Sequence, residues 1–126
     1  MQQLLIIGLG GALGAMARYS VYFIYATTGG KLFPLPTLVV NVVGSFLIGI
    51  AYYAIVERLQ LQAVWRNGLI VGFLGAFTTF STYSLDALRI LQNGELSIAL
   101  GYLLLSVVLC LIATWLGFWI VERFLV

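Results

Sequence analysis

Long apolar stretches separated by short polar breaks make up most of this 126-residue chain. Each stretch reaches the roughly 20 residues that a helix needs to cross about 30 Å of hydrocarbon. The pattern predicts four membrane-spanning helices at about residues 3–25, 36–56, 67–92 and 96–122. Because the loops between them are too short to fold alone, we expect an all-α protein with a single transmembrane domain over residues 1–126.

Turn-forming and charged residues mark the expected ends of these helices. The markers are Thr27 to Lys31, Pro34 with Pro36, Glu57-Arg58, Asn93-Gly94-Glu95 and Glu122-Arg123. Three pairs of small residues lie four apart within the helices. They are Gly10 with Gly14, Ser45 with Gly49, and Gly68 with Gly72. This spacing lets helices approach closely in lipid, and helix packing is sufficient to explain most of these glycines.

The third apolar stretch contains a polar segment, GAFTTFSTYS at residues 75–84. Five hydroxyl side chains lie there among three aromatic rings. Lipid offers no water to a polar or irregular backbone, so such a segment is tolerated only where protein buries it or where it lines a wet path. We therefore expect a polar group or an ion to contact the protein at this position.

Composition agrees with a membrane protein. Hydrophobic residues account for 63% of the chain and charged residues for only 8%, against roughly 25% in ordinary soluble domains. The single cysteine, Cys110, excludes an internal disulfide and a cysteine metal site, and there is no histidine. The net charge of +2 gives no reason to expect nucleic acid as a partner. The chain offers no nucleophile, general base or nucleotide site, so we expect neither an enzyme nor a catalytic residue.

Positive charges are distributed almost evenly between the two membrane sides. Arg58, Arg66 and Arg123 lie on the side of the termini, while Lys31 and Arg89 lie on the other side. Because such charges normally set orientation, this near tie favours insertion in both directions and hence an antiparallel homodimer. A weakly biased chain with a single orientation is the alternative.

Arg18 and Asn41 are two conspicuous polar side chains within the first and second predicted spans. Arg18 is an intramembrane charge, which favours a functional role. Direct contact with an ion and a structural tie to backbone carbonyls are equally compatible with this position, and a side chain that reaches the interface is a further alternative. Asn41 shares a helical face with Thr37 and Ser45, so it either joins helices by hydrogen bonding or faces a pore.

The fourth span carries a stripe of polar residues four apart: Tyr102, Ser106, Cys110 and Thr114. Hydroxyls in helices often bond to their own backbone, so one alone would mean little. Hydrogen-bond donors dominate the polar residues of the spans, and Asp86 is the only deep acid. Cation pathways usually recruit acidic rings or carbonyl cages. Donors and the positive edges of aromatic rings instead suit a small hydrated anion.

Three segments of the sequence resemble one family. GGALGAMARY at residues 10–19, TLVVNVVGSFLIG at 37–49 and GFLGAFTTFSTYS at 72–84 are together similar to the Fluc, or CrcB-type, fluoride channels. The three motifs fall in order on three spans, and the length and four-span layout match over the whole chain.

The resemblance implies passive, selective export of fluoride through two narrow pores of a dual-topology antiparallel homodimer in the plasma (inner) membrane. It also implies a third helix that is broken at the TTFST stretch. Backbone carbonyls of Gly75 and Thr78 are expected to hold a structural sodium ion on the dimer axis. The pore residues that the resemblance implies are Phe80, Tyr83, Asn41, Arg18 and the fourth-span stripe, and no nucleotide is involved.

Two positions depart from the family pattern. Tyr83 stands where phenylalanine is usual, which adds a hydroxyl at a position expected to face the pore. Cys110 stands where a hydroxyl is expected, and a thiol is a weak donor. Ion preference and conductance are the properties that these departures affect.

Two other classes of protein fit a small four-span chain. A proton-coupled exporter of the small multidrug-resistance type needs an acid in its first span, but Met1 to Tyr25 contains none. A non-transporting scaffold subunit would use the polar stripes only to join helices. Such a subunit would not need a polar segment that carries three aromatic rings.

Overall fold

The computed structural model describes residues 1–28 and 33–124, and the chain is helical over almost all of them. The elements are α1 (Gln2–Thr27), α2 (Leu35–Ala51), η1 (Tyr52–Arg58), α3 (Ala63–Arg66), η2 (Asn67–Leu74), α4 (Gly75–Phe77), α5 (Phe80–Gln92) and α6 (Leu96–Phe124). Segments η1 and η2 are π-helical. In this described part of the chain, four spans are long and apolar enough to cross a membrane, which confirms an all-α, four-span protein.

The four spans run Gln2–Thr27, Leu35–Arg58, Ala63–Gln92 and Leu96–Phe124. The third starts before the expected residue 67, because Ala63–Arg66 already forms a helical turn. The turn expected at Thr27 to Lys31 lies partly outside the described residues, since its positions from residue 29 onward are among those not described.

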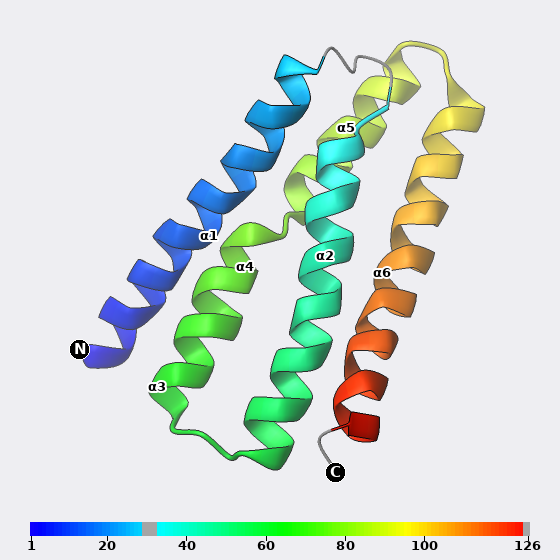
Figure 1. Ribbon diagram of the computed structural model, residues 1–126. Helices are drawn as coiled ribbons and strands as arrows, with labels where there is room; N and C mark the ends of the chain where they lie inside the picture. The colour runs from blue at the N-terminus through cyan, green and yellow to red at the C-terminus, as the bar shows by residue number, and fades with distance from the viewer. Residues whose placement is uncertain (29–32, 125–126) are drawn as a thin grey trace.

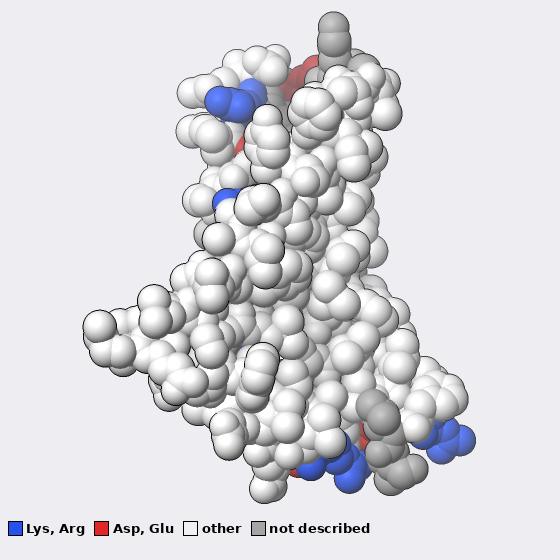
Figure 2. Space-filling model, turned by 60° about the vertical axis from the view of Figure 1, so that its left-hand side comes forward, with Lys and Arg blue, Asp and Glu red and all other residues white. Residues whose placement is uncertain are grey.

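The spans form a slanted bundle in which α2 lies between the third span and α6 (Figure 1). Helix α1 packs along η2, and α6 packs along α2. Both described chain ends and the 59–62 connection lie at one end of the bundle, opposite the α5–α6 turn. Charged side chains gather towards the two ends and leave a broad band of other residues between them (Figure 2). This distribution is the one expected of a protein that crosses a bilayer.

Glycines allow two pairs of spans to touch backbone to backbone. A Cβ atom added to Gly14 would collide with the carbonyl of Phe73, and one added to Gly10 would collide with the carbonyl of Gly68. On the other side of the bundle, Gly49 lies equally close to the carbonyl of Thr114. The small-residue pairs therefore pack helices, as their spacing predicted.

Local sequence explains where helices start and stop. Helix α2 has Pro34 at its N-cap and Pro36 in its first turn, where the missing N–H costs nothing. Helix α5 ends at a Schellman motif: Gly94 has φ +81° and its N–H bonds the Leu91 carbonyl, while the Glu95 N–H bonds the Ile90 carbonyl. The chain thus reverses within the predicted Asn93-Gly94-Glu95 turn.

A cluster of buried side chains joins α2, α5 and α6 in the half of the bundle nearest that turn. Its members are Leu38, Tyr83, Ala87, Ile90, Ala99 and Tyr102. This cluster fixes α5 against the two helices that carry the predicted polar stripes. It therefore positions the start of α5, where the polar segment lies.

Candidate functional site

Helix geometry is interrupted at two residues inside the polar segment. Thr78 (φ −83°, ψ 160°) and Thr79 (φ −153°, ψ 118°) have extended backbone between α4 and α5. In a continuous helix the Thr79 N–H would bond the Gly75 carbonyl. Here it instead donates to the side chain of Asn41 (2.8 Å). The interruption therefore leaves backbone groups that must find other partners at membrane depth.

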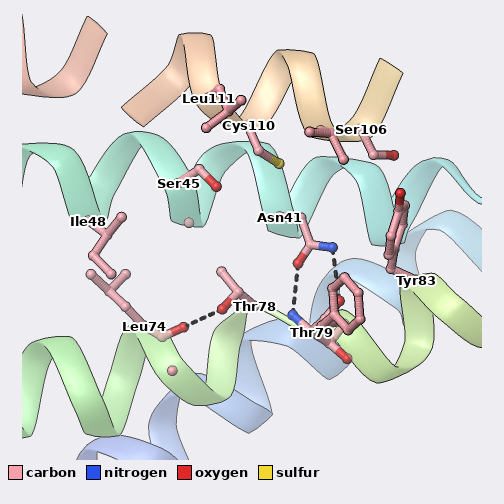
Figure 3. Close-up of a pocket in the computed structure, with 14 residues that line it drawn as sticks. Asn41, Ser45, Ile48, Leu74, Thr78, Thr79, Tyr83, Ser106, Cys110 and Leu111 are labelled. Atoms are coloured by element: carbon pink, nitrogen blue, oxygen red, sulfur yellow. Dashed lines mark hydrogen bonds between the residues drawn. The ribbon is translucent and has the colours of Figure 1, made fainter. Parts of the chain in front are cut away.

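Asn41 on α2 supplies two of those partners. Its Oδ1 accepts from the Thr79 N–H, and its Nδ2 donates to the Thr79 carbonyl at 2.9 Å (Figure 3). One amide thus satisfies both backbone groups of a single extended residue. Asn41 joins two helices, as one alternative held, and it also lines the pocket described below.

The threonine and serine hydroxyls of the segment organise the start of α5. Thr79 is the N-cap residue, and its Oγ1 accepts from the Thr82 N–H at 3.1 Å. The same hydroxyl lies 3.0 Å from the Thr82 hydroxyl and 3.3 Å from that of Ser81. Thr78 turns the other way and donates to the Leu74 carbonyl at 3.0 Å. The Thr79 hydroxyl therefore replaces a missing helical acceptor at the start of α5, whereas the Thr78 hydroxyl adds a second donor to a carbonyl that keeps its helical bond.

Arg18 reaches the same place from α1. Its Nη1 donates to the Thr78 carbonyl at 3.4 Å, and the contact is partly buried. Of the roles weighed for Arg18, the structural tie to a carbonyl is the one that this geometry displays. The guanidinium also brings a positive charge to the interruption.

A pocket of about 380 Å³ lies beside the interruption, between the third span, α2 and α6. Among the described residues, its lining contains no Asp, Glu, Lys or Arg and combines polar side chains with two aromatic rings. The polar and aromatic members are Asn41, Ser45, Thr78, Thr79, Ser106, Cys110, Phe80 and Tyr83. Five predicted site residues, those at 41, 80, 83, 106 and 110, therefore share one cavity, as do both residues named for the metal, Gly75 and Thr78.

Tyr83 shows how a tyrosine fits where the family pattern has phenylalanine. Its hydroxyl donates to the Leu103 carbonyl on α6 at 2.9 Å. That proton is therefore committed to α6, and the ring is what Tyr83 adds to the pocket. The rings of Phe80 and Tyr83 lie 5.4 Å apart.

Thr37 lies apart from Asn41 and Ser45, although all three were predicted to share a face. It lines a second cavity of about 280 Å³ together with Tyr22 and Asp86. Thr37 donates to Asp86 Oδ2 at 2.6 Å, so the Tyr22 hydroxyl, 2.6 Å from Thr37, must donate to Thr37. Residues four apart advance about 40° around a helix at each step, so the stripe drifts away from the first pocket.

The α6 stripe divides in the same way. Ser106 and Cys110 line the first pocket, whereas Tyr102 and Thr114 do not. Tyr102 is fully buried at 0% exposure, and Thr114 donates to the Cys110 carbonyl of its own helix at 3.0 Å. The hydroxyls of Tyr102 and Ser106 are buried and have no hydrogen-bond partner within residues 1–28 and 33–124.

Two residues at the site were not anticipated. Gly44 lets α2 approach the interruption, because an added Cβ would collide with Thr78 Cγ2. Tyr22 completes the chain of hydrogen bonds that ends at Asp86. A sequence signal existed for Tyr22, which follows Gly14 and Arg18 at four-residue steps on α1.

Comparison with known proteins gives consistent matches. The family model described as CrcB-like protein, Camphor Resistance (CrcB), matches residues 5–118. The "Fluoride-specific ion channel FluC" of Saccharophagus degradans is 48% identical over 119 residues, which cover 94% of this chain and 89% of the relative. The protein of the same name from Hahella chejuensis is 47% identical over 114 residues, which cover 90% of each chain.

Proposed function

The chain belongs to the CrcB-like protein family, and we propose that it is a fluoride channel through which the anion leaves the cell passively, down its electrochemical gradient. Its four spans and its family make it a multi-pass integral membrane protein, located in the inner membrane in bacteria. Membership in a channel family also confirms the expectation that the chain is not an enzyme.

The observation that carries the proposal is the pocket beside Thr78 and Thr79. A small anion must exchange its water shell for donors, and side chains of Asn41 and Ser106 offer them. The amide of Asn41 has two N–H groups, and the pair with Thr79 uses one of them. The Ser106 hydroxyl is without a partner in the described part of the chain. Within residues 1–28 and 33–124, no acidic side chain lines the cavity to repel an anion.

The other proposed path residues have unequal support. The hydroxyl of Tyr102 is buried and has no described hydrogen-bond partner, so its proton is available to donate to an anion. Thr37 has committed its proton to Asp86, and Thr114 has committed its proton to a backbone carbonyl. Arg18 supports the path by charge and by its tie to Thr78. Because Tyr102 lies outside the first pocket, we propose that it contacts the anion further along the path, and that Thr37, Thr114 and Arg18 support the path without donating to the anion.

Carbonyl groups at the interruption fit the proposed sodium site. Hard cations prefer oxygen ligands, and the Gly75 carbonyl has lost its helical donor to Asn41. The Thr78 carbonyl accepts from Arg18 but keeps a second lone pair. When bound, sodium would supply positive charge close to the anion path and would bind carbonyls that lipid leaves unsolvated.

We propose further that two copies associate in antiparallel orientation to give two pores, with the third helix broken at Thr78 and Thr79. The extended backbone at these residues supports the break. Phe80 supports the association, because it is 77% exposed in the single chain although it lines the pocket. A second copy would enclose this ring and close the open side of the path.

The direct test uses purified protein in sealed vesicles loaded with potassium fluoride. A channel releases fluoride when valinomycin lets potassium follow, and it needs no proton gradient. A scaffold subunit releases no fluoride under any gradient. Release without valinomycin that follows an imposed proton gradient would instead identify a proton-coupled exporter.

The pore assignment is tested in the same vesicles with Phe80→Ile. Because Phe80 is exposed, we expect this variant to fold normally but to release fluoride at least roughly tenfold more slowly, since one ring edge is lost. Leu88→Ile on the same helix, also exposed, is the matched control and should conduct normally. Normal conduction by Phe80→Ile would refute the assignment of Phe80 to the pore.

The role of sodium has a separate test. Dimer assembly that is unchanged without sodium would refute a structural role for the ion.

A further inference from the structure

Four aromatic rings form a row that runs from the first pocket to the second cavity. Phe80 and Tyr83 line the first pocket, and their ring centroids are 5.4 Å apart. The ring of Tyr102 follows, 5.3 Å from Tyr83 and 5.5 Å from Phe33, which lines the second cavity. Tyr83 and Tyr102 are buried members of the cluster that joins α2, α5 and α6. These two rings therefore lie between the two cavities.

The side chain of Tyr83 is attached to the protein at both of its ends. Its backbone belongs to α5, and its hydroxyl donates to the Leu103 carbonyl on α6 at 2.9 Å. Figure 3 shows the ring reaching from α5 towards α6, on the side of the pocket where Ser106 lies. Because the hydroxyl lies on the axis about which the ring flips, the hydrogen bond permits ring flips but opposes a swing of the whole ring about χ1.

The donors proposed for the anion lie on both sides of these rings. Asn41 and Ser106 line the first pocket, whereas the buried hydroxyl of Tyr102 lies outside it. Buried side chains are packed too closely to leave an open passage between them. An anion that moves from the first group of donors to the second therefore needs a ring to move aside. Tyr83 is the ring of the buried pair that borders the first pocket.

We propose that Tyr83 sets the rate of anion passage: its ring swings aside for each ion, and its hydrogen bond to the Leu103 carbonyl holds the ring in the closed position. The hydroxyl is thus a positioning group, which acts through the ring and does not touch the anion. A phenylalanine, which the family resemblance predicts at this position, keeps the ring but lacks the hold. The effect on transport rests on the proposed function, whereas the restraint on the ring does not.

Tyr83→Phe tests the effect on transport in vesicles loaded with potassium fluoride or potassium chloride, with valinomycin present. Since one net hydrogen bond no longer has to break, we expect fluoride release to become roughly threefold to tenfold faster. Chloride release should stay at the level of protein-free vesicles, because the ring remains in place. A damaged protein would release fluoride more slowly or would also release chloride. Either of these results, or an unchanged fluoride rate, would overturn the proposal.

Tyr52→Phe is the matched control, since it removes the same atom from a tyrosine elsewhere in the chain. Tyr52 lies on η1, is exposed, and lies outside both cavities. This variant should release fluoride at the wild-type rate. An equal acceleration in both variants would show that the effect does not come from the bond between Tyr83 and Leu103.

The restraint on the ring can be measured without transport. Solid-state NMR of the protein in fluoride-free lipid gives the order parameter of the side chain at residue 83. We expect a clearly lower order parameter in Tyr83→Phe than in the wild type, because the bond to α6 is lost. Equal order parameters would overturn the restraint, whatever the transport rates. Absence of fluoride release from the wild type would refute the proposed function, and the order parameters would then decide by themselves whether the hydroxyl holds the ring.

Discussion

The two halves of the third span contact the neighbouring helices in different ways. Its first half, η2, lies against α1 at Gly10 and Gly14, where the two backbones are in direct contact. Its second half begins with two extended residues. The Asn41 side chain pairs both backbone groups of Thr79, and Arg18 bonds the Thr78 carbonyl. The first arrangement excludes everything else from the contact, whereas the second leaves a cavity lined by polar groups.

The difference shows how a small membrane protein separates stability from function. A helix satisfies its own backbone, so close packing between α1 and η2 needs only small residues. An interrupted helix needs partners from other spans, and each partner side chain also brings donors into the interior. The polar interior therefore results from the same side chains that stabilise the interruption. We thus expect substitutions at the interruption to affect both stability and transport, and substitutions between α1 and η2 to affect stability alone.

The largest expected effect follows from enlarging Gly14. Gly14→Leu should abolish the folded protein, because its side chain would have to occupy the position of the Phe73 backbone and would push α1 away from η2. Overpacking costs typically about 1–3 kcal/mol, and more where backbone must move. The measurement is the yield of monodisperse protein after extraction in mild detergent.

Gly8→Leu is the control for this substitution, since an added Cβ at Gly8 meets no described atom within 4 Å. It should behave as the wild type does. If the two variants were equally stable, close packing of α1 on η2 would not be what stabilises this region.

The next largest effect concerns Asn41. Asn41→Leu leaves the N–H and the carbonyl of Thr79 unpaired, and each unpaired group costs about 1–3 kcal/mol. We expect a marked fall in the midpoint of thermal unfolding, together with loss of fluoride efflux. Ser45→Ala, in the same pocket, should change the midpoint little. Efflux that survives in a stable Asn41→Leu protein would show that the interruption does not depend on this amide.

A smaller effect is expected at the helix cap. Thr79→Val preserves the shape of the side chain but removes the acceptor for the Thr82 N–H, which typically costs about 1 kcal/mol. Thermal unfolding should detect this loss. The control is Ser84→Ala, because the Ser84 hydroxyl is exposed and bonds only the Phe80 carbonyl of its own helix. Equal midpoints for both variants would mean that the cap contributes no stability.

The sequence was sufficient to predict the four spans, the polar segment and the packing role of the glycines. Each of these follows from local periodicity or from spacing within one helix. The pairing of Asn41 with Thr79 could not be predicted, because the two residues are 38 positions apart and meet only through tertiary packing. Each of the two stripes of residues four apart, one on α2 and one on α6, also appeared straighter in sequence than in space. Drift around the helix carries Thr37 on α2, and Tyr102 and Thr114 on α6, away from the first pocket.

The π-helical segments and the exact extent of the third span were also beyond prediction. Segments η1 and η2 carry no distinctive residue pattern, since π-helical bonding depends on how neighbouring spans pack. Tyr83 illustrates a further limit, because its hydroxyl turns to the Leu103 carbonyl rather than into the cavity. Only the position of α6 decides between these two directions.

Our central claim is that side-chain donors and ring edges around the pocket take the place of the water that fluoride must shed. The most direct test compares fluoride and chloride efflux from matched vesicles that contain the wild-type chain, with valinomycin present in both. We predict rapid release of fluoride and a chloride release no faster than that of protein-free vesicles. Release of neither ion, or equal release of both, would contradict the claim.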